Sequence, residues 1–293
     1  MASPAQAAIN ETCPLRDDDA RTRRAILRPR MPTHSITPLR LTITRTWHIT
    51  KLVLASLALQ ACGVEQEAPI PTPALTDTQA GFYAMIQAGD TGPARIRIRQ
   101  RIDAGDLDSR LYFLMGLAHH WDRQYSMAAE WFAQADQADP PYPPAAHFMG
   151  WALYHSGQPE ESHAAFLKHV RMVPDEGDSY FALGVLALER GDFEQASKAL
   201  HEAIELQKDN PSRRTGVAKA TARLSEVTEH RDGNLALACE QLARAVAMDP
   251  DLYEAHFRLA RLLHRMQRPN AAEAAMRAGQ EAQERVDAGR KRP

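Results

Sequence analysis

The 293-residue sequence is poor in cysteine and lacks the spacings that metal and redox sites need. Its three cysteines, Cys13, Cys62 and Cys239, share no short spacing, which excludes a disulfide framework. The 12 histidines form no His-Glu-x-x-His motif, and no Gly-rich loop is followed by Lys-Ser or Lys-Thr. We therefore expect no metal site, no cofactor and no catalytic constellation, so the chain is predicted not to be an enzyme.

Positive charge is also scarce over most of the chain. Residues 1–61 carry nine Lys and Arg against four Asp and Glu, whereas residues 62–293 carry 26 against 33. A mildly acidic body has no basic face with which to neutralise phosphates, so we expect no nucleic-acid binding. The content of 44% hydrophobic and 25% charged residues is that of a folded, soluble protein.

The apolar run LVLASLALQA, residues 52–61, is too short to cross a membrane. It has ten residues, about half of what a spanning helix needs. Arg40, Arg45 and Lys51 precede it. This order of a basic flank and a short apolar run is typical of a secretory signal peptide.

A short motif at the end of this run resembles the lipobox of bacterial lipoproteins. Leu59 stands three residues before Cys62, and the small Ala61 immediately before it. The resemblance implies cleavage before Cys62 and a diacylglycerol on its thiol. Gly63 then favours the outer membrane, facing the periplasm. The alternatives are an ordinary secretory peptide, or an apolar segment buried in a folded amino-terminal region of a cytoplasmic protein.

The composition divides the chain into consecutive segments. Prolines after Cys62 favour an extended, water-exposed spacer. Translation starts at Met1 or at Met31, and Met31 gives a signal peptide of more usual length. The predicted segments are an extension with a lipoprotein signal at 1–61, a Pro-rich tether at 62–74, a degenerate first repeat at 75–108, strong repeats at 109–286 and a basic tail at 287–293.

A period of 34 residues organises the remainder of the sequence. Gly116, Gly150 and Gly184 stand 34 residues apart in amphipathic stretches. Pro140 and Pro174 close the first two units, because Pro cannot continue a helix. Each of these glycines is followed after twelve residues by a second small residue, Ala128, Ser162 or Ala196, and after sixteen by a large apolar one, Phe132, Phe166 or Leu200.

The same offsets return after a longer connection at 209–218, which delays the phase by eight residues. Ala238 and Leu242, and then Ala272 and Met276, repeat the second-helix pattern. Each unit is predicted to be two antiparallel helices, with the large residue wedged between neighbouring units. Three units have a glycine between their helices, which suits the left-handed turn at a helix end: Gly157, Gly191 and Gly233.

This pattern resembles the tetratricopeptide repeat, which has a 34-residue period, small residues in both helices and a closing Pro. The resemblance covers five units and a degenerate sixth before them. It implies an all-α superhelix (an α-α solenoid) of five to six helix-turn-helix units, after an unstructured amino-terminal region. Glu226 and Ala260 at the first-helix small site, and His169 in place of Ala, depart from the pattern. The alternative is an irregular helical bundle, which requires a phase that drifts.

The resemblance also implies that the first helices line a concave surface. The positions expected to face it are aromatic in the first three strong units and basic in the last two. We expect an extended protein or peptide ligand with apolar anchors and an acidic group. The alternative is that the aromatics are ordinary solenoid core. The predicted partner-binding residues are Phe113, His120, Trp121, His147, Trp151, Tyr154, Phe181, Arg223, Phe257, Arg261 and Arg265.

Together these features predict a lipid-anchored scaffold that binds a protein or peptide in the cell envelope. The alternative function is a soluble regulatory or accessory subunit of a cytoplasmic enzyme. The alternating arginines Arg95, Arg97, Arg99 and Arg101 are expected on a solvated helix. Contact with phosphates or lipid headgroups near the tether is the alternative for these arginines.

Overall fold

The computed structural model describes residues 72–290, apart from the side chain of Arg290. These residues belong to one compact unit. The predictions for the signal peptide, for lipidation at Cys62 and for most of the tether lie outside the described residues. None of the helices between residues 72 and 290 is both long and apolar enough to cross a membrane.

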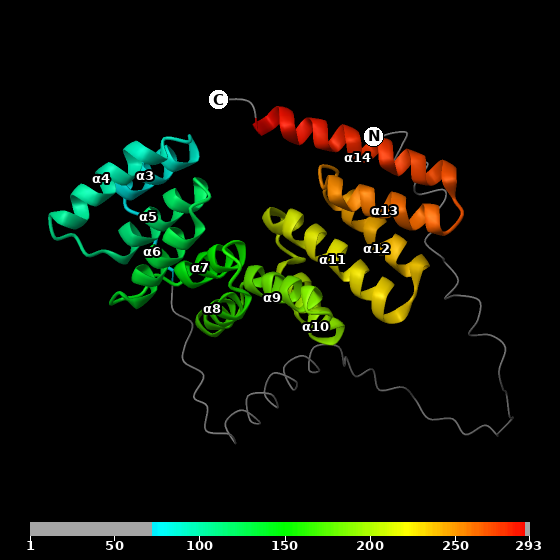
Figure 1. The fold of residues 1–293 in the computed structure, drawn as a ribbon, viewed down its shortest axis with the longest axis horizontal. Helices are drawn as coiled ribbons and strands as arrows, with labels where there is room; N and C mark the ends of the chain where they lie inside the picture. The colour runs from blue at the N-terminus through cyan, green and yellow to red at the C-terminus, as the bar shows by residue number, and fades with distance from the viewer. Residues whose placement is uncertain (1–71, 291–293) are drawn as a thin grey trace, which may run out of the picture. The chain divides into compact units, whose positions relative to one another are not determined.

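The described residues form consecutive pairs of helices, with no strand among them (Figure 1). The prediction of an all-α superhelix is confirmed. The pairs are α3 (Asp77–Gln87) with α4 (Thr91–Asp103), α5 (Ser109–Trp121) with α6 (Tyr125–Gln137), α7 (Pro144–His155) with α8 (Pro159–Met172), α9 (Gly177–Glu189) with α10 (Phe193–Gln207), α11 (Arg214–Asp232) with α12 (Leu235–Met248), and α13 (Tyr253–Arg265) with α14 (Pro269–Arg290).

Each helix packs mainly on its neighbours in the sequence. The main contacts beyond sequence neighbours join first helices of successive pairs, namely α3 with α5, α5 with α7 and α9 with α11. Packing restricted to adjacent units is the defining property of a solenoid. The irregular bundle considered above does not describe this arrangement.

The glycines of the 34-residue period bring the two helices of a unit together. A Cβ atom on Gly116 would lie 2.6 Å from the ring of Phe132, and one on Gly150 would lie 2.6 Å from the ring of Phe166. The Phe132 ring also lies 5.9 Å from the ring of Phe148 in the next unit. The predicted wedge between neighbouring units is therefore confirmed for Phe132, whereas Met276, at the same position of the last described unit, is 42% exposed.

In every described pair, the turn between the two helices contains a residue with a left-handed backbone conformation at the equivalent position of the repeat. The three predicted glycines have positive φ angles, so that prediction is confirmed. Two residues with a Cβ atom adopt the same conformation, which L-residues adopt at a cost. The six positions are Gly89, Arg123, Gly157, Gly191, Gly233 and Gln267.

The eight-residue delay before the fourth strong unit is mostly helix and not a loop. A short 3-10 helix, η3 (Pro211–Arg213), leads directly into α11. That helix has 19 residues, whereas α9 has 13. The connection expected at 209–218 is thus corrected, because its second half extends the first helix of the unit.

The alternating arginines lie on a helix, α4, as expected. They do not share one environment. Arg95 pairs with Asp122, Arg101 pairs with an aspartate in the following loop, and Arg97 is exposed. The guanidinium carbon of Arg99 lies 4.7 Å from the centre of a tryptophan ring.

Candidate protein-binding groove

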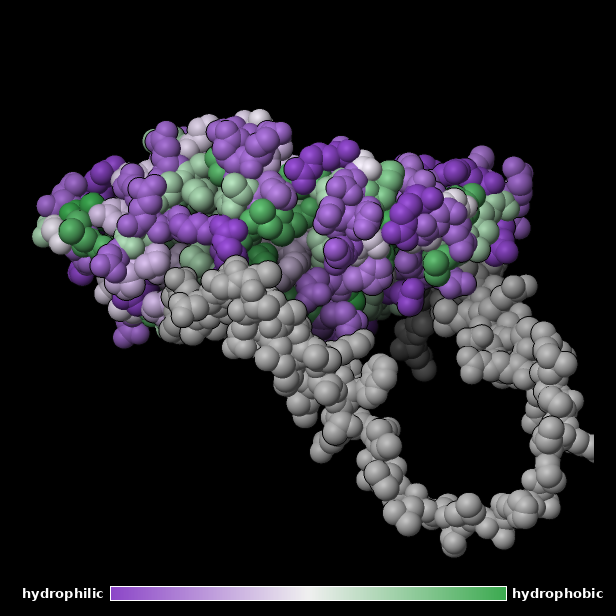
Figure 2. Space-filling view, turned by 90° about the horizontal axis from the view of Figure 1, so that it is seen from below, coloured by the Kyte–Doolittle hydropathy of each residue, from purple (hydrophilic) through white to green (hydrophobic). Residues whose placement is uncertain are grey.

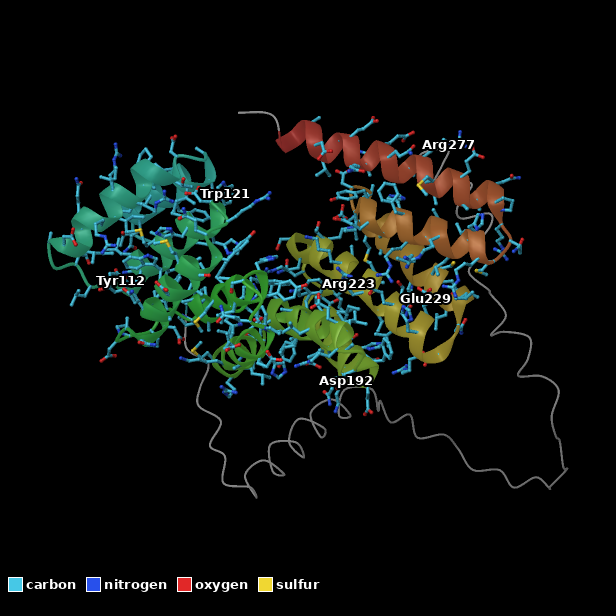
Figure 3. The ribbon with its side chains drawn as sticks, viewed as in Figure 1. Tyr112, Trp121, Asp192, Arg223, Glu229 and Arg277 are labelled. Carbon is cyan, nitrogen blue, oxygen red and sulfur yellow. The ribbon has the colours of Figure 1, made fainter. Side chains whose placement is uncertain are left out.

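Aromatic rings connect the first helices of successive units. The rings of His120 on α5 and His155 on α7 lie 6.1 Å apart. His155 also stacks against Trp151, with ring centres 6.1 Å apart, and Trp151 lies 6.5 Å from Phe181 on α9. At the end of α5, Trp121 is 55% exposed (Figure 3). A row of rings therefore runs across three units.

This row is uncharged at neutral pH. Burial, and to a smaller extent the nearby His155, lowers the pKa of His120 below its usual value. Burial also lowers the pKa of His155. Both imidazoles are therefore neutral at pH 7, and they behave as aromatic surface. The Nδ1 atom of His120 is buried without a hydrogen-bond partner.

Polar side chains continue the row beyond the rings. The hydroxyl of Tyr154 on α7 donates a hydrogen bond to Glu189 on α9, and this bond raises the pKa of the phenol. Further along, Arg265 on α13 forms an ion pair with Glu229 on α11. These pairs join residues 35 and 36 positions apart, so equivalent faces of successive first helices lie side by side.

A cationic pocket lies where α9, α11 and α13 meet. It has a volume of about 290 Å³, and Phe181 forms one wall. Three cations line it against one carboxylate, Glu254. The lining residues are Phe181, Lys219, Ala222, Arg223, Leu252, Glu254, Ala255 and Arg258.

Positive charge is in excess at this pocket. The carboxylate of Glu226 forms ion pairs with both Arg223 and Arg258, so two cations share one acidic side chain. Burial, followed by repulsion from Arg223 and Arg261, lowers the pKa of Arg258 to about 9. The Nε atom of Arg258 is buried and has no hydrogen-bond partner. An anionic group of a ligand would reduce this repulsion.

Two of the predicted aromatic residues pack against neighbouring helices. Phe113 is 6% exposed and packs between Phe132 and Phe148, so it belongs to the core. Phe257 is half-buried, and its ring faces Gly279 on α14. These two residues follow the alternative considered from the sequence, in which aromatics are solenoid core.

His147 is also turned inward, toward the next unit. Its Nδ1 atom lies 2.8 Å from the hydroxyl of Ser179, which is 3.0 Å from Nδ1 of His169. Burial lowers the pKa of His147 to about 4, with a smaller contribution from His169. The departure from the repeat pattern at His169 therefore provides a buried hydrogen bond to the following unit.

Of the remaining predicted residues, Phe181 and Arg223 line the cationic pocket, and the other residues of this pocket were not predicted from the sequence. Three residues of the pocket do not occupy any of the four positions in each first helix that the family resemblance predicts to face the concave surface. These residues are Lys219, Glu254 and Arg258. The spacing of four residues from Lys219 to Arg223, and from Glu254 to Arg258, places each pair on one helix face and was the available signal. All the predicted residues except Phe113 are at least partly exposed: His120, Trp121, His147, Trp151, Tyr154, Phe181, Arg223, Phe257, Arg261 and Arg265.

Comparison with known proteins supports the same fold. Residues 149–212 match the family model described as tetratricopeptide repeat. Over 126 residues, the chain is 29% identical to human cilia- and flagella-associated protein 70, which corresponds to 41% of this chain and 11% of that protein. The chain thus spans about a tenth of the length of that relative.

Solved structures extend the similarity over more of the chain. The structure of pilF from Pseudomonas aeruginosa aligns with 67% of this chain and 86% of its own, at 14% identity and a TM-score of 0.57. YrrB, described as a TPR protein with an unusual peptide-binding site, aligns with 64% of this chain and 92% of its own, at 18% identity and a TM-score of 0.45. The chain is therefore an all-α superhelix with the tetratricopeptide-repeat fold, and residues 149–212 carry the family match.

Proposed function

We propose that the groove along the first helices binds an extended segment of a protein or peptide. The observation that carries this proposal is the position of Phe181. Its ring lies 6.5 Å from Trp151 at one side, and it lines the cationic pocket with Arg223 at the other. Aromatic and cationic parts thus meet in one surface. The chain then acts by binding, without catalysis of its own.

The chemistry of the two parts defines the ligand. The exposed ring of Trp121 and the partly buried ring of Trp151 offer anchoring surface for apolar side chains, and aromatic residues and Arg dominate binding hot spots. The pocket at Arg223 and Arg258 suits a carboxylate, because Arg forms paired hydrogen bonds with carboxylate oxygens. The preferred ligand is an extended segment with apolar residues followed by an acidic residue or a free carboxyl terminus.

We further propose that this binding takes place in the cell envelope, with the protein attached to the outer membrane by a lipid on Cys62 and facing the periplasm. Support comes from the sequence: an apolar run of ten residues ends at Ala61, directly before Cys62, in the motif Leu59-Gln60-Ala61-Cys62. In that arrangement the Pro-rich residues after Cys62 space the groove away from the bilayer. A soluble accessory subunit of a cytoplasmic enzyme remains the competing function.

Crosslinking and capture from cell fractions test both parts. A Trp151→Ala, Arg223→Ala double variant should lose the partner that the wild-type protein captures. Arg277→Ala, on the exposed surface of α14, is the control and should retain it (Figure 3). Cys62→Ser should move the protein from the membrane fraction to the soluble fraction. Capture that survives the double variant contradicts the groove, and an unchanged distribution of Cys62→Ser contradicts the anchor.

A further inference from the structure

A second concave feature lies on the other side of α9 from the groove. It is a cleft of about 750 Å³ between α8, α9 and α10. Its apolar lining comes from Leu167, Leu183, Ala187 and Ala199, and Tyr180 forms a wall. At 100° per residue, Leu183 and Ala187 point away from the groove-facing side of α9. On the face shown in Figure 2, apolar residues interrupt the hydrophilic surface.

The 34-residue period identifies what fills the same place in the first strong unit. Two periods separate Tyr112 from Tyr180, and Trp131 from Ala199. Trp131 is 9% exposed and stacks on Tyr112, with ring centres 6.2 Å apart and planes at 17°. Arg99 lies on the indole, with its guanidinium carbon 4.7 Å from the ring centre. The indole thus contacts both a phenol ring and a cation.

The third strong unit retains only one side of this arrangement. Tyr180 keeps the phenol ring, but Ala199 replaces the tryptophan, and Leu167 stands where Arg99 would be. In the second unit the three equivalent positions are all alanine, and Ala146 and Ala165 are buried there, so that the helices close together. The space stays open beside Tyr180 because a large wall residue remains while the indole is missing.

We infer that this cleft is a binding site for a small planar aromatic molecule, stacked on Tyr180 above Ala199 in the place that the Trp131 indole occupies two units earlier. Offset stacking on a phenol ring and burial against aliphatic side chains both favour such a ligand. The volume lies within the range of small-molecule sites, whose lining is mostly apolar with a few polar groups. This site is independent of the groove and of the function proposed for it.

The rim of the cleft specifies the charge of the ligand. Arg190 and Lys198 are balanced by Asp192 and Glu202. Asp192 lies at the lower edge of the fold in Figure 3. Because neither sign is in excess, the site favours a neutral or zwitterionic aromatic compound over a singly charged one.

Calorimetric titration of the full chain with indole tests the inference. We expect saturable binding of one indole per chain. Ala199→Trp should abolish it, because the new side chain occupies the site. Ala236→Trp, at an exposed position of α12, is the matched control and should bind indole like the wild-type protein. Tyr180→Leu should weaken binding by roughly two- to tenfold, which corresponds to the loss of one aromatic pair.

Three results would overturn the site. The first is the absence of saturable binding, and the second is undiminished binding to a folded Ala199→Trp variant. If that variant does not fold, Tyr180→Leu carries the test, and unchanged affinity of this variant is the third. Titration with indole-3-acetate and tryptamine tests the rim, since tighter binding of either one than of indole would contradict the expected preference for a ligand without net charge.

Discussion

A single methyl group added at Gly150 should destabilise the solenoid. In Gly150→Ala the new Cβ would lie 2.6, 2.7 and 2.8 Å from three ring atoms of Phe166. That ring is 0% exposed, so it cannot turn into solvent. Overpacking of a core typically costs about 1–3 kcal/mol, whereas Gly to Ala within a helix gains about 0.5–1 kcal/mol. We expect a net loss of up to about 2.5 kcal/mol.

A matched substitution elsewhere should have the opposite sign. Gly81 lies within α3 and has nothing within 4 Å of the position that a Cβ would occupy. Gly81→Ala should therefore stabilise the protein by about 0.5–1 kcal/mol. Urea denaturation followed by circular dichroism compares the two variants. Stabilisation by Gly150→Ala equal to that by Gly81→Ala would refute the proposed close packing.

A second substitution, which replaces the Phe166 ring by a more flexible side chain, tests the same contact. An unbranched methionine side chain can move away from a Cβ atom at position 150, which the aromatic ring of Phe166 cannot do. Combining Gly150→Ala with Phe166→Met should therefore cost less than the sum of the two single changes. A coupling free energy of at least about 1 kcal/mol is expected for residues in direct contact. Simple additivity would contradict the contact.

Other measurements follow from the turns, the buried histidine and the outer cleft. Gln267→Gly should raise the free energy of unfolding by less than about 1 kcal/mol, because Gln267 has a φ of 59°, which glycine adopts more readily. Gly157→Ala should lower the free energy of unfolding by about 1 kcal/mol, because Gly157 also has a positive φ. Urea denaturation measures both changes. The pKa of His147 is lowered to about 4 in the folded protein, so the unfolded chain binds one more proton than the folded one between pH 6.5 and 4. Acidification from pH 6.5 to 4 should therefore lower the free energy of unfolding by up to about 3 kcal/mol. The His147→Gln variant should not show this loss. Equilibrium unfolding at each pH compares the two proteins. Leu167→Arg combined with Ala199→Trp restores the side chains of the first unit and should raise the melting temperature in a thermal scan; a lowered one would contradict the equivalence of the two sites.

The fold was largely predictable because small and large residues recur at fixed spacings in the repeat. A glycine opposite a large apolar residue sixteen positions later, as in Gly116 and Phe132, is a local relation between two helices of one unit. Such relations do not depend on the remainder of the chain. The extension of α11 was not predictable in this way, since its first three residues, Arg214, Thr215 and Gly216, resemble a loop in composition. The left-handed Arg123 carries no sequence signal, because its side chain disfavours that conformation.

The site was predictable in position and less so in its members. The number of positions between a residue and the small residue of its helix gives the angle of that residue around the helix axis. It does not show how far the next unit buries the residue. Phe113 is at a groove position by angle, yet Phe148 of the following unit covers it. Conversely, the long side chains of Lys219 and Arg258 reach the pocket from positions that the angle alone leaves out.

Position-specific photocrosslinking in cells tests the groove most directly. A photoreactive amino acid is placed at Trp121 in the aromatic part of the groove, at Arg223 in its cationic part, or at Ala236 on the exposed surface of α12. The account predicts crosslinks from both groove positions to the same partner, and none to that partner from Ala236. Crosslinks of equal yield from all three positions, or from Ala236 alone, would contradict binding along the first helices.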